Sequence, residues 1–556
     1  MKRKTLSLML IFVLSVFVLV GCGSNTVTTN PEGVMDTIPT EKVKIEFWHA
    51  MGQSNQKVIE EMIAEFNKKY PNIEVTAISK GGYTDLREAI IYGCAAGTGP
   101  AVAQTYQDHV AMYIHTYNAR KLDPFINHDN SEIALSKEEQ NQILPSYLAE
   151  GSQYQKEGMY SMPFNKSSET LYYNRNFFCD HYEDLKQYGV EVSERGYFLP
   201  ANSAEAQGES KYWTEKTEDV NGTKKLTIDG AEKEFKAVER VTNVDWKFPT
   251  WEQVEAIARY YTNSQEAADV YAELKKENPD KTKEDLVSGF AADSQANLFI
   301  TLTQQYSNSD TSYTTVNKST GEGILNFASN DTSVTKSKEA LTWFVNGYKE
   351  GIFATATRFG EDYSSNAFAA RRCVMTLGSS AGSSYNVNAD GVFQTNVTQY
   401  PQLASAYQEK NPTKKYVIQQ GTNVTLFRNK DPKVEMAGWL FIKHIISYEM
   451  ALKWALNTSY YPIRKDVYES EDYQDYLKGI KRVDGKVQLN EPTIGALTQI
   501  VVESQRDSMF TNVSFVGSSD VRDEAENLVI AATKGGTGID EAYSLAVKNI
   551  KAKMGQ

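Results

Sequence analysis

Residues 161–174 read SMPFNKSSETLYYN, and this stretch decides how the rest of the chain is interpreted. A proline and a cluster of small polar residues come directly before a run with paired tyrosines, which is typical of a strand. Three hydroxyl side chains, Ser167, Ser168 and Thr170, stand where this extended run begins. The sequence on either side explains why a strand would carry so many of them.

The segment that precedes this stretch predicts alternating strands and helices. Val43, Ile45 and Phe47 alternate as in a strand. The next apolar residues fall on one face of a helix that ends before Pro71. A strand over 73–78, a helix over 83–99 and a strand over 101–106 follow. This order predicts a mostly parallel sheet covered by helices, a fold that binds ligands at the carboxyl ends of its strands.

The N-terminus predicts the compartment. Lys2, Arg3 and Lys4 precede an apolar run over 6–20, which is typical of a secretory signal. The run ends in Leu-Val-Gly-Cys at 19–22, which resembles the bacterial lipoprotein signal. That resemblance implies a signal peptide over 1–21, lipidation of Cys22 and an extracytoplasmic protein held at the cell membrane by its lipid. Residues 22–41 are small and polar and predict a flexible tether. The alternative is an uncleaved anchor with an incidental cysteine.

Charge and cysteine content exclude several classes of partner. Loss of the first 21 residues removes three cations and no acid, so the formal charge changes from −13 to −16. Such an acidic surface repels nucleic acid and anionic lipid headgroups, and we expect neither as a partner. The other three cysteines, Cys94, Cys179 and Cys373, form no paired spacing. The six histidines show no ligand spacing, so we expect no metal and no cofactor.

One enzyme pattern needs a test. GSSAG at 378–382 fits G-x-S-x-G with Ser380 as the nucleophile. That motif requires an acid and then a histidine later in the chain. The only later histidine is His444, which lies in an apolar helical stretch. We therefore expect no enzyme, and a cell-surface hydrolase of serine or glycosidase type stays as an alternative.

Several motifs in order along the chain identify a family. FWHAM at 47–51, AEFNKKYPNIEV at 64–75, AAGTGPAVAQ at 95–104 and MPFNKSSETLYYNRNFF at 162–178 resemble the family 1 extracellular solute-binding proteins. These are the substrate-binding components of bacterial ABC importers. The resemblance implies an α/β, two-lobed periplasmic-binding-protein-like fold of type II, with a ligand cleft between lobes joined by hinge strands. Residues 161–174 would be the first crossover, and their hydroxyl groups would face the cleft.

The length of the chain also requires two lobes, because about 535 residues are too many for one core. We expect the first lobe over 42–165 and 401–430. The second lobe would comprise 166–400 and 431–556, with a polar insertion at about 186–245.

Within the family, the pattern is closest to the type that binds sn-glycerol-3-phosphate and its diesters. By that resemblance Tyr83 covers the ligand, Gln107 binds its hydroxyl groups and Gly421 offers a backbone N–H. Ser167 and Ser379 would hydrogen-bond the phosphate, and Tyr460 and Arg522 would complete the anion site.

Two departures leave a neutral sugar or oligosaccharide as the alternative ligand. Gln107 stands where the relative has a glutamate. Residues 289–307 lack two tryptophans of that relative, so stacking would come from Trp213 or Trp246.

We therefore expect the protein to bind a ligand and to release it chemically unaltered. A monomeric, lipid-anchored protein would close on a small carbohydrate or glycerophospho ligand and deliver it to ABC permease subunits. A lipoprotein that uses the same fold for sensing or adhesion, without transport, is the other alternative.

Overall fold

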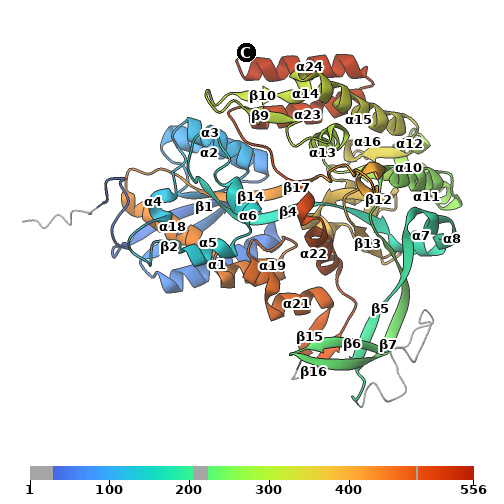
Figure 1. The fold of residues 1–556 in the computed structure, drawn as a ribbon, viewed down its shortest axis with the longest axis horizontal. Coiled ribbons are helices and arrows are strands. Elements are labelled where there is room, and N and C mark those ends of the chain that lie inside the picture. The colour runs from blue at the N-terminus through green and yellow to red at the C-terminus, as the bar shows by residue number, and fades with distance from the viewer. Residues whose placement is uncertain (1–28, 204–222, 484–485, 556) are drawn as a thin grey trace, which may run out of the picture.

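Two lobes lie side by side in the computed structural model, which describes residues 29–203, 223–483 and 486–555 (Figure 1). Each lobe has its own hydrophobic core. Phe47, Phe66 and Trp439 belong to the core of the first lobe, and Trp251 and Phe290 belong to that of the second. The predicted α/β class and two-lobed organisation are confirmed.

The first lobe begins with the predicted alternation of strands and helices. Its strands pair in parallel in the order β2-β1-β3, as the sequence pattern requires. The elements of this part are β1 (Val43–His49), α1 (Gln53–Lys69), β2 (Ile73–Ser79), α2 (Tyr83–Ala96), β3 (Val102–Thr105), α3 (Gln107–His115), α4 (Asp123–Ile126), α5 (Lys137–Gln142) and α6 (Pro145–Glu150).

The second lobe is built around the parallel strands β11, β8 and β12. Its strands and helices are α7 (Arg175–Asp180), α8 (Tyr182–Leu185), α10 (Trp251–Thr262), α11 (Gln265–Glu277), α12 (Lys283–Leu286), β8 (Ser288–Ala292), α13 (Gln295–Ser307), β9 (Thr314–Val316), β10 (Gly323–Leu325), α14 (Asn326–Ser329), α15 (Asp331–Lys349), β11 (Phe353–Thr355), α16 (Ala356–Phe359), α17 (Ser364–Ala369), β12 (Cys373–Ser379), β13 (Thr395–Thr398), α22 (Ile494–Ser504), β17 (Met509–Phe510), α23 (Ser518–Ala532) and α24 (Ile539–Lys553). Thr250 caps α10 with the hydrogen bond typical of a capping box.

Two long strands join the lobes. β4 (Ser161–Asn174) is the stretch quoted first, and it pairs antiparallel with β14 (Val417–Leu426) over much of its length. β4 continues into the second lobe beside β12, and β14 continues into the first lobe beside β3. One sheet therefore runs through both lobes in the order β11-β8-β12-β4-β14-β3-β1-β2.

The structure corrects three predicted boundaries. Residues 401–418, which we expected in the first lobe, lie with the second core, where Leu403, Val417 and Ile418 pack. The predicted tether is wrong for residues 29–41, because Val34 and Met35 are buried in the first core and the Glu32 carbonyl accepts a hydrogen bond from Arg120. The helices that follow β14 also belong to the first core, whereas we expected everything beyond 431 in the second lobe. They are α18 (Pro432–Ile445), α19 (Tyr448–Asn457), α20 (Lys465–Glu469) and α21 (Glu471–Lys478).

The predicted signal peptide, 1–21, and Cys22 lie outside the described residues. Within the described ranges, no helix combines the length and apolar character needed to cross a membrane.

The insertion near 186–245 contributes to a separate five-stranded sheet, which we call the accessory sheet (bottom of Figure 1). Its strands follow the order β15-β16-β5-β7-β6. Three come from the insertion and two from the segment after α21: β5 (Val190–Pro200), β6 (Thr223–Ile228), β7 (Ala231–Trp246), β15 (Ile480–Val483) and β16 (Lys486–Leu489).

Arg482 of β15 ties the accessory sheet to the first lobe. Its guanidinium lies 3.0 Å from Asp229 at the β6–β7 turn and 2.7 Å from Asp475 on α21, and it also pairs with Glu471. At the other end of β7, Val244 and Trp246 are buried in the second core. The accessory sheet therefore forms a further connection between the lobes, beside the hinge strands.

We predict that Arg482→Ala loosens the accessory sheet and leaves the two cores intact, because one guanidinium holds three carboxylates from two elements. Hydrogen exchange should become severalfold faster in β15, β16 and the β6–β7 turn, and it should not change in β1 or β8. Lys225→Ala, which breaks an ion pair within β6 and β7, is the matched control. Unchanged exchange in β15 and β16 would contradict the proposed role of Arg482.

Candidate functional site

A cavity of about 110 Å³ lies between the lobes, and we call it the interlobe cavity. The first lobe contributes Tyr106, Gln107, Asp108 and Glu150. The remaining lining residues come from β14 and from the second-lobe side: Thr314, Ile418, Gln419, Gln420, Gly421, Thr511, Asn512, Val513, Ser514, Ser518 and Arg522. Most of the lining residues have polar side chains, and Ile418, Val513 and the Tyr106 ring add apolar surface, so the cavity suits a ligand such as a sugar with both kinds of face.

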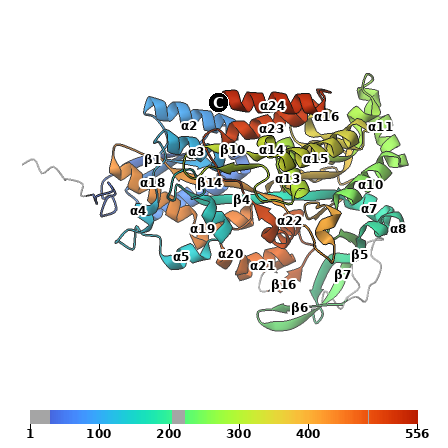
Figure 2. The same ribbon diagram turned by 45° about the horizontal axis from the view of Figure 1, so that its top comes forward.

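The lobes touch each other directly around this cavity. Arg87 on α2 lies 3.6 Å from Asp523 on α23. The backbone N–H of Ser514 donates to the Gln153 carbonyl at 3.2 Å, and the Thr511 hydroxyl donates to the Gln153 side chain at 3.0 Å. The structure thus has the lobes closed over the cavity, with α2 and α3 against α23 (Figure 2).

Gly421 allows the two hinge strands to approach closely at the cavity. Its φ of +93° lies in the left-handed region that favours glycine. A Cβ at this position would collide with the backbone carbonyl oxygen of Asn165 on β4. Glycine is therefore required here by both conformation and space.

A buried ion pair lies beside the cavity. Lys166 of β4 is fully buried and pairs with Glu150, and its ammonium also lies 3.4 Å from the Gly421 carbonyl. Burial raises the pKa of Glu150 and lowers that of Lys166, and the attraction between the two charges opposes both shifts. The Gln107 side chain donates to the Glu150 carbonyl at 3.2 Å, so its amide nitrogen is already engaged within the first lobe.

Tyrosines form the aromatic part of the site. The Tyr106 ring meets that of Tyr83 edge to face, with centroids 4.8 Å apart. Tyr460 stacks on Trp454 at 5.7 Å. Burial raises the pKa of Tyr83, and the nearby Tyr460 and Tyr106 phenols raise it further. Trp246, one of the two predicted stacking residues, is instead buried in the second core, and Trp213 lies outside the described residues.

A chain of hydrogen bonds connects Arg522 to the hinge. Arg522 donates to the side-chain oxygen of Asn297, and the Asn297 amide donates to Glu169 of β4 at 2.8 Å. Gln420, which also lines the cavity, donates to the same Glu169 oxygen at 3.4 Å. The other Glu169 oxygen is buried and has no partner among the described residues. One carboxyl group thus positions two donors of the cavity.

The environment of Glu169 raises its pKa to about 8. Burial is the largest cause and the nearby carboxylate of Asp293 adds to it, whereas the Asn297 hydrogen bond and the charge of Arg522 act in the opposite direction. Glu169 is therefore protonated below this pKa and ionised above it.

The structure brings most of the predicted site residues together. Gln107, Gly421 and Arg522 line the interlobe cavity, and Tyr83 and Tyr460 adjoin it through Tyr106. Ser167 and Ser379 lie 3.5 Å apart across β4 and β12, but neither belongs to the cavity lining.

Five important residues were not predicted: Tyr106, Asp108, Glu150, Glu169 and Asn297. Tyr106 and Asp108 flank Gln107 in the sequence, so the position of Gln107 could have indicated them. Glu169 and Asn297 meet through pairing between segments 128 residues apart, and Glu150 pairs with Lys166, 16 residues later on the crossing strand.

The hydrolase motif lacks its partner residues. The Ser380 hydroxyl accepts a hydrogen bond from the Ser168 backbone at 3.1 Å and is buried at the hinge. His444 lies on α18 in the first lobe, where its Nε2 contacts the Met62 carbonyl at 3.0 Å. Ser380 is thus part of the hinge packing and His444 part of the first-lobe packing. Among the described residues, no group of His, Cys, Asp and Glu side chains is arranged to hold a metal ion.

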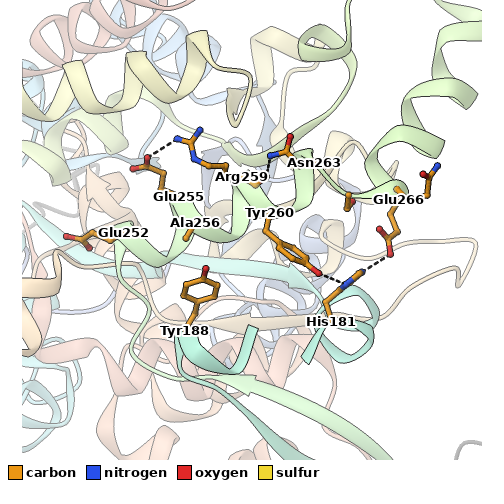
Figure 3. Close-up of a pocket in the computed structure, with 11 residues that line it drawn as sticks. His181, Tyr188, Glu252, Glu255, Ala256, Arg259, Tyr260, Asn263 and Glu266 are labelled. Atoms are coloured by element: carbon orange, nitrogen blue, oxygen red, sulfur yellow. Dashed lines mark hydrogen bonds and ion pairs between the residues drawn. The ribbon is translucent and has the colours of Figure 1, made fainter. Parts of the chain in front are cut away.

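A larger groove of about 910 Å³ lies on the surface of the second lobe (Figure 3). His181 contacts the Tyr260 hydroxyl at 2.9 Å and Glu266 at 2.7 Å within it. All of its lining residues belong to one lobe, so lobe closure would not enclose a ligand there. The interlobe cavity is the better candidate site.

Comparison with known proteins gives one family. A family model described as bacterial extracellular solute-binding protein matches residues 61–479. The sn-glycerol-3-phosphate-binding periplasmic protein UgpB of Salmonella typhimurium is 27% identical over 139 residues, which cover 24% of this chain and 30% of that protein. UgpB of Escherichia coli K12 is 25% identical over 162 residues, 27% of this chain and 36% of that one. These matches span about a third of the relatives' length.

Solved structures share the fold over almost the whole chain. An ABC substrate-binding protein of Listeria monocytogenes in complex with cycloalternan has a TM-score of 0.59 and 15% identity, covering 93% of this chain and 100% of its own. UgpB of Mycobacterium tuberculosis in complex with glycerophosphocholine has a TM-score of 0.55 and 13% identity, with 92% and 98% covered. At such low sequence identity, the similarity to these structures shows a shared fold only.

We predict that Gly421→Ala destabilises the protein by more than about 2 kcal/mol, because alanine is strained at this φ and its Cβ meets the Asn165 carbonyl. Urea denaturation measures the change. Gly382→Ala is the control, because a Cβ there meets nothing within 4 Å. Equal stability of the two variants would contradict the close approach of the hinge strands.

We predict that Glu169→Gln flattens the pH dependence of stability. A carboxyl group whose pKa rises from 4.5 in the unfolded chain to about 8 in the fold contributes stability below pH 4.5. That contribution is lost as the pH rises toward 8. Between pH 4.5 and 8, the free energy of unfolding of the wild type should fall by on the order of a few kcal/mol more than that of Glu169→Gln. Parallel pH profiles of the two proteins would show that the pKa of Glu169 does not change on folding, which would contradict the prediction.

Proposed function

The chain belongs to the bacterial extracellular solute-binding proteins, and we propose that it is the extracytoplasmic binding component of an ABC importer. It captures a carbohydrate or a polyol phosphate such as sn-glycerol-3-phosphate between its lobes and delivers it to the permease. The observation that carries the proposal is the polar interlobe cavity, to which both lobes and β14 contribute lining residues. A ligand that contacts both lobes at once favours the closed state, which is how capture becomes a signal to the permease.

The charges around the cavity narrow the choice of ligand. Arg522 is the only lysine or arginine among its lining residues, and Asp108 and Glu150 are its only acidic ones. Glu150 is neutralised by Lys166, whereas Asp108 accepts a backbone hydrogen bond from His109 and has no lysine or arginine partner among the described residues. A phosphate dianion would gain Arg522 but would be repelled by Asp108. An uncharged sugar or a monoanionic phosphodiester fits this balance better.

The relatives support both ligand chemistries. UgpB proteins are named for sn-glycerol-3-phosphate, and one fold relative was solved in complex with glycerophosphocholine and another with cycloalternan. The Tyr83–Tyr106 pair and Tyr460 offer aromatic surface next to the cavity, which suits the apolar faces of a sugar or polyol.

We also propose that a lipid on Cys22 attaches the protein to the cell membrane. A lipid anchor keeps the protein near the permease without a spanning helix. Mass spectrometry of the protein purified from its own membrane tests this part, and a Cys22→Ala variant that stays bound to the membrane would contradict it.

A thermal-shift screen tests the ligand class. The panel consists of sn-glycerol-3-phosphate, glycerophosphocholine, maltose and cycloalternan. A true ligand at a hundredfold its Kd adds about 2.7 kcal/mol of stability, and it should be recovered unaltered. No stabilisation by any of the four, or a bound compound recovered in cleaved form, would contradict the proposed function.

Arg522→Gln then separates the two chemistries. It should weaken the binding of a phosphate-bearing ligand by about tenfold or more, because it removes a charge-assisted hydrogen bond. The affinity for an uncharged sugar should fall less. Arg259→Gln, at an exposed arginine on α10, is the control. If Arg522→Gln binds the ligand as tightly as Arg259→Gln does, Arg522 is not part of the site.

A further inference from the structure

A cationic cavity lies in the second lobe, away from the interlobe cavity. Its volume is about 480 Å³, and its lining residues come from α12, α16 and the segment just after α23, among others. Four cationic side chains line it: Lys281, Arg358, Arg372 and Lys534. Asp285 is the only acidic residue of the lining. A concentration of positive charge in one cavity is unusual on a chain whose formal charge is −13.

Arg358 is the central group of this cavity. Its guanidinium lies against the Tyr348 ring, with Cζ 3.9 Å from the ring centroid, and one terminal nitrogen donates to the Phe353 carbonyl at 2.9 Å. Its Nε is buried and has no hydrogen-bond partner among the described residues. No carboxylate of the described chain forms an ion pair with it, and burial lowers its pKa. The charges of Asp285 and Glu284 oppose this shift without cancelling it, so the partly buried cation is unfavourable until an anion pairs with it directly.

The neighbouring charges leave room for such an anion. Among the described residues, the Lys534 ammonium hydrogen-bonds only to the Thr357 carbonyl, at 3.2 Å. The Lys281 ammonium forms no ion pair in the described chain, although its charge acts on Asp285. The Asp285 carboxylate accepts hydrogen bonds from the Thr282 N–H and hydroxyl, at 3.0 Å each.

Arg372 differs from the other three cations. It pairs with Glu361 and donates to the carbonyls of Leu286, Phe359 and Asp285, which together use four of its five N–H groups, so it forms the wall of the cavity. Arg358, Lys281 and Lys534 therefore retain unused donors, and the acids nearby are already engaged.

We propose that this cavity binds a small anion that carries a phosphate group. Phosphate oxygens would accept hydrogen bonds from the second terminal nitrogen of Arg358, which donates to no described residue and is not buried, and from the two lysines. The site lies wholly within the second lobe, so it does not depend on the ligand that binds between the lobes. Free phosphate and a phosphate monoester both supply the oxygen acceptors and the negative charge that these donors require.

Isothermal titration of the protein with inorganic phosphate and, separately, with phenyl phosphate tests the proposal. Binding of either compound at millimolar concentration or below is expected, and the tighter one tells whether free phosphate or an ester suits the cavity. Arg358→Gln should weaken binding by about tenfold or more. Lys534 is exposed, so the Lys534→Gln variant should fold, and it should weaken phosphate binding severalfold. This variant tests the site if Arg358→Gln does not fold. Arg259→Gln is the matched control and should bind as the wild type does.

Three results would overturn the inference. The first is no heat of binding with either compound. The second is unchanged affinity in both Arg358→Gln and Lys534→Gln. The third is loss of binding in Arg522→Gln alone, because the anion would then occupy the interlobe cavity. That last result would leave the proposed function standing, so the two proposals fail separately.

Discussion

The antiparallel pairing of β4 with β14 is the constraint on which the rest of the structure depends. These two strands carry the chain between the cores, and they do so while burying Lys166 against Glu150. Removal of one partner of a buried pair leaves an uncompensated charge, which is strongly unfavourable. Gly421 then lets the strands approach closely where the cavity forms. The hinge and the candidate site thus share residues, so we expect movement of one lobe to shift the groups that line the interlobe cavity.

Glu169 shows how this coupling reaches the far side of the cavity. Through Asn297 it orients Arg522 of the second lobe, and it also accepts from Gln420 of β14. A carboxyl group buried in the crossing strand therefore sets the direction of donors on two separate elements. The accessory sheet adds a second kind of coupling, because it runs from the second core to α21 of the first lobe and lies outside the hinge. We expect these features to limit the relative positions of the lobes, as the proposed capture of a ligand would require.

Local sequence patterns predicted the parts of the fold that depend on nearby residues. The alternation over 43–106 appears as β1, α1, β2, α2 and β3, and the paired tyrosines lie on the crossing strand as expected. The assignment of α18 to α21 was wrong because an apolar helix can pack on either lobe, and only tertiary contacts decide. Glu150 and Glu169 could not be predicted as site residues, because tertiary pairing places them at the cavity. Glu150 is held by Lys166, which itself contacts Gly421 of the distant strand β14, and Glu169 is held by Asn297 of α13. Arg522, by contrast, was indicated by its motif and does line the cavity.

The central claim is that the two lobes move as units about β4 and β14 and close on a small hydrophilic molecule. Small-angle X-ray scattering of the protein, with and without the ligand that stabilises it most in the thermal-shift screen, tests this claim most directly. The account predicts a smaller radius of gyration for the bound protein and a scattering curve that matches the closed structure. An identical curve for the free and the bound protein, with binding verified in the same sample, would contradict it.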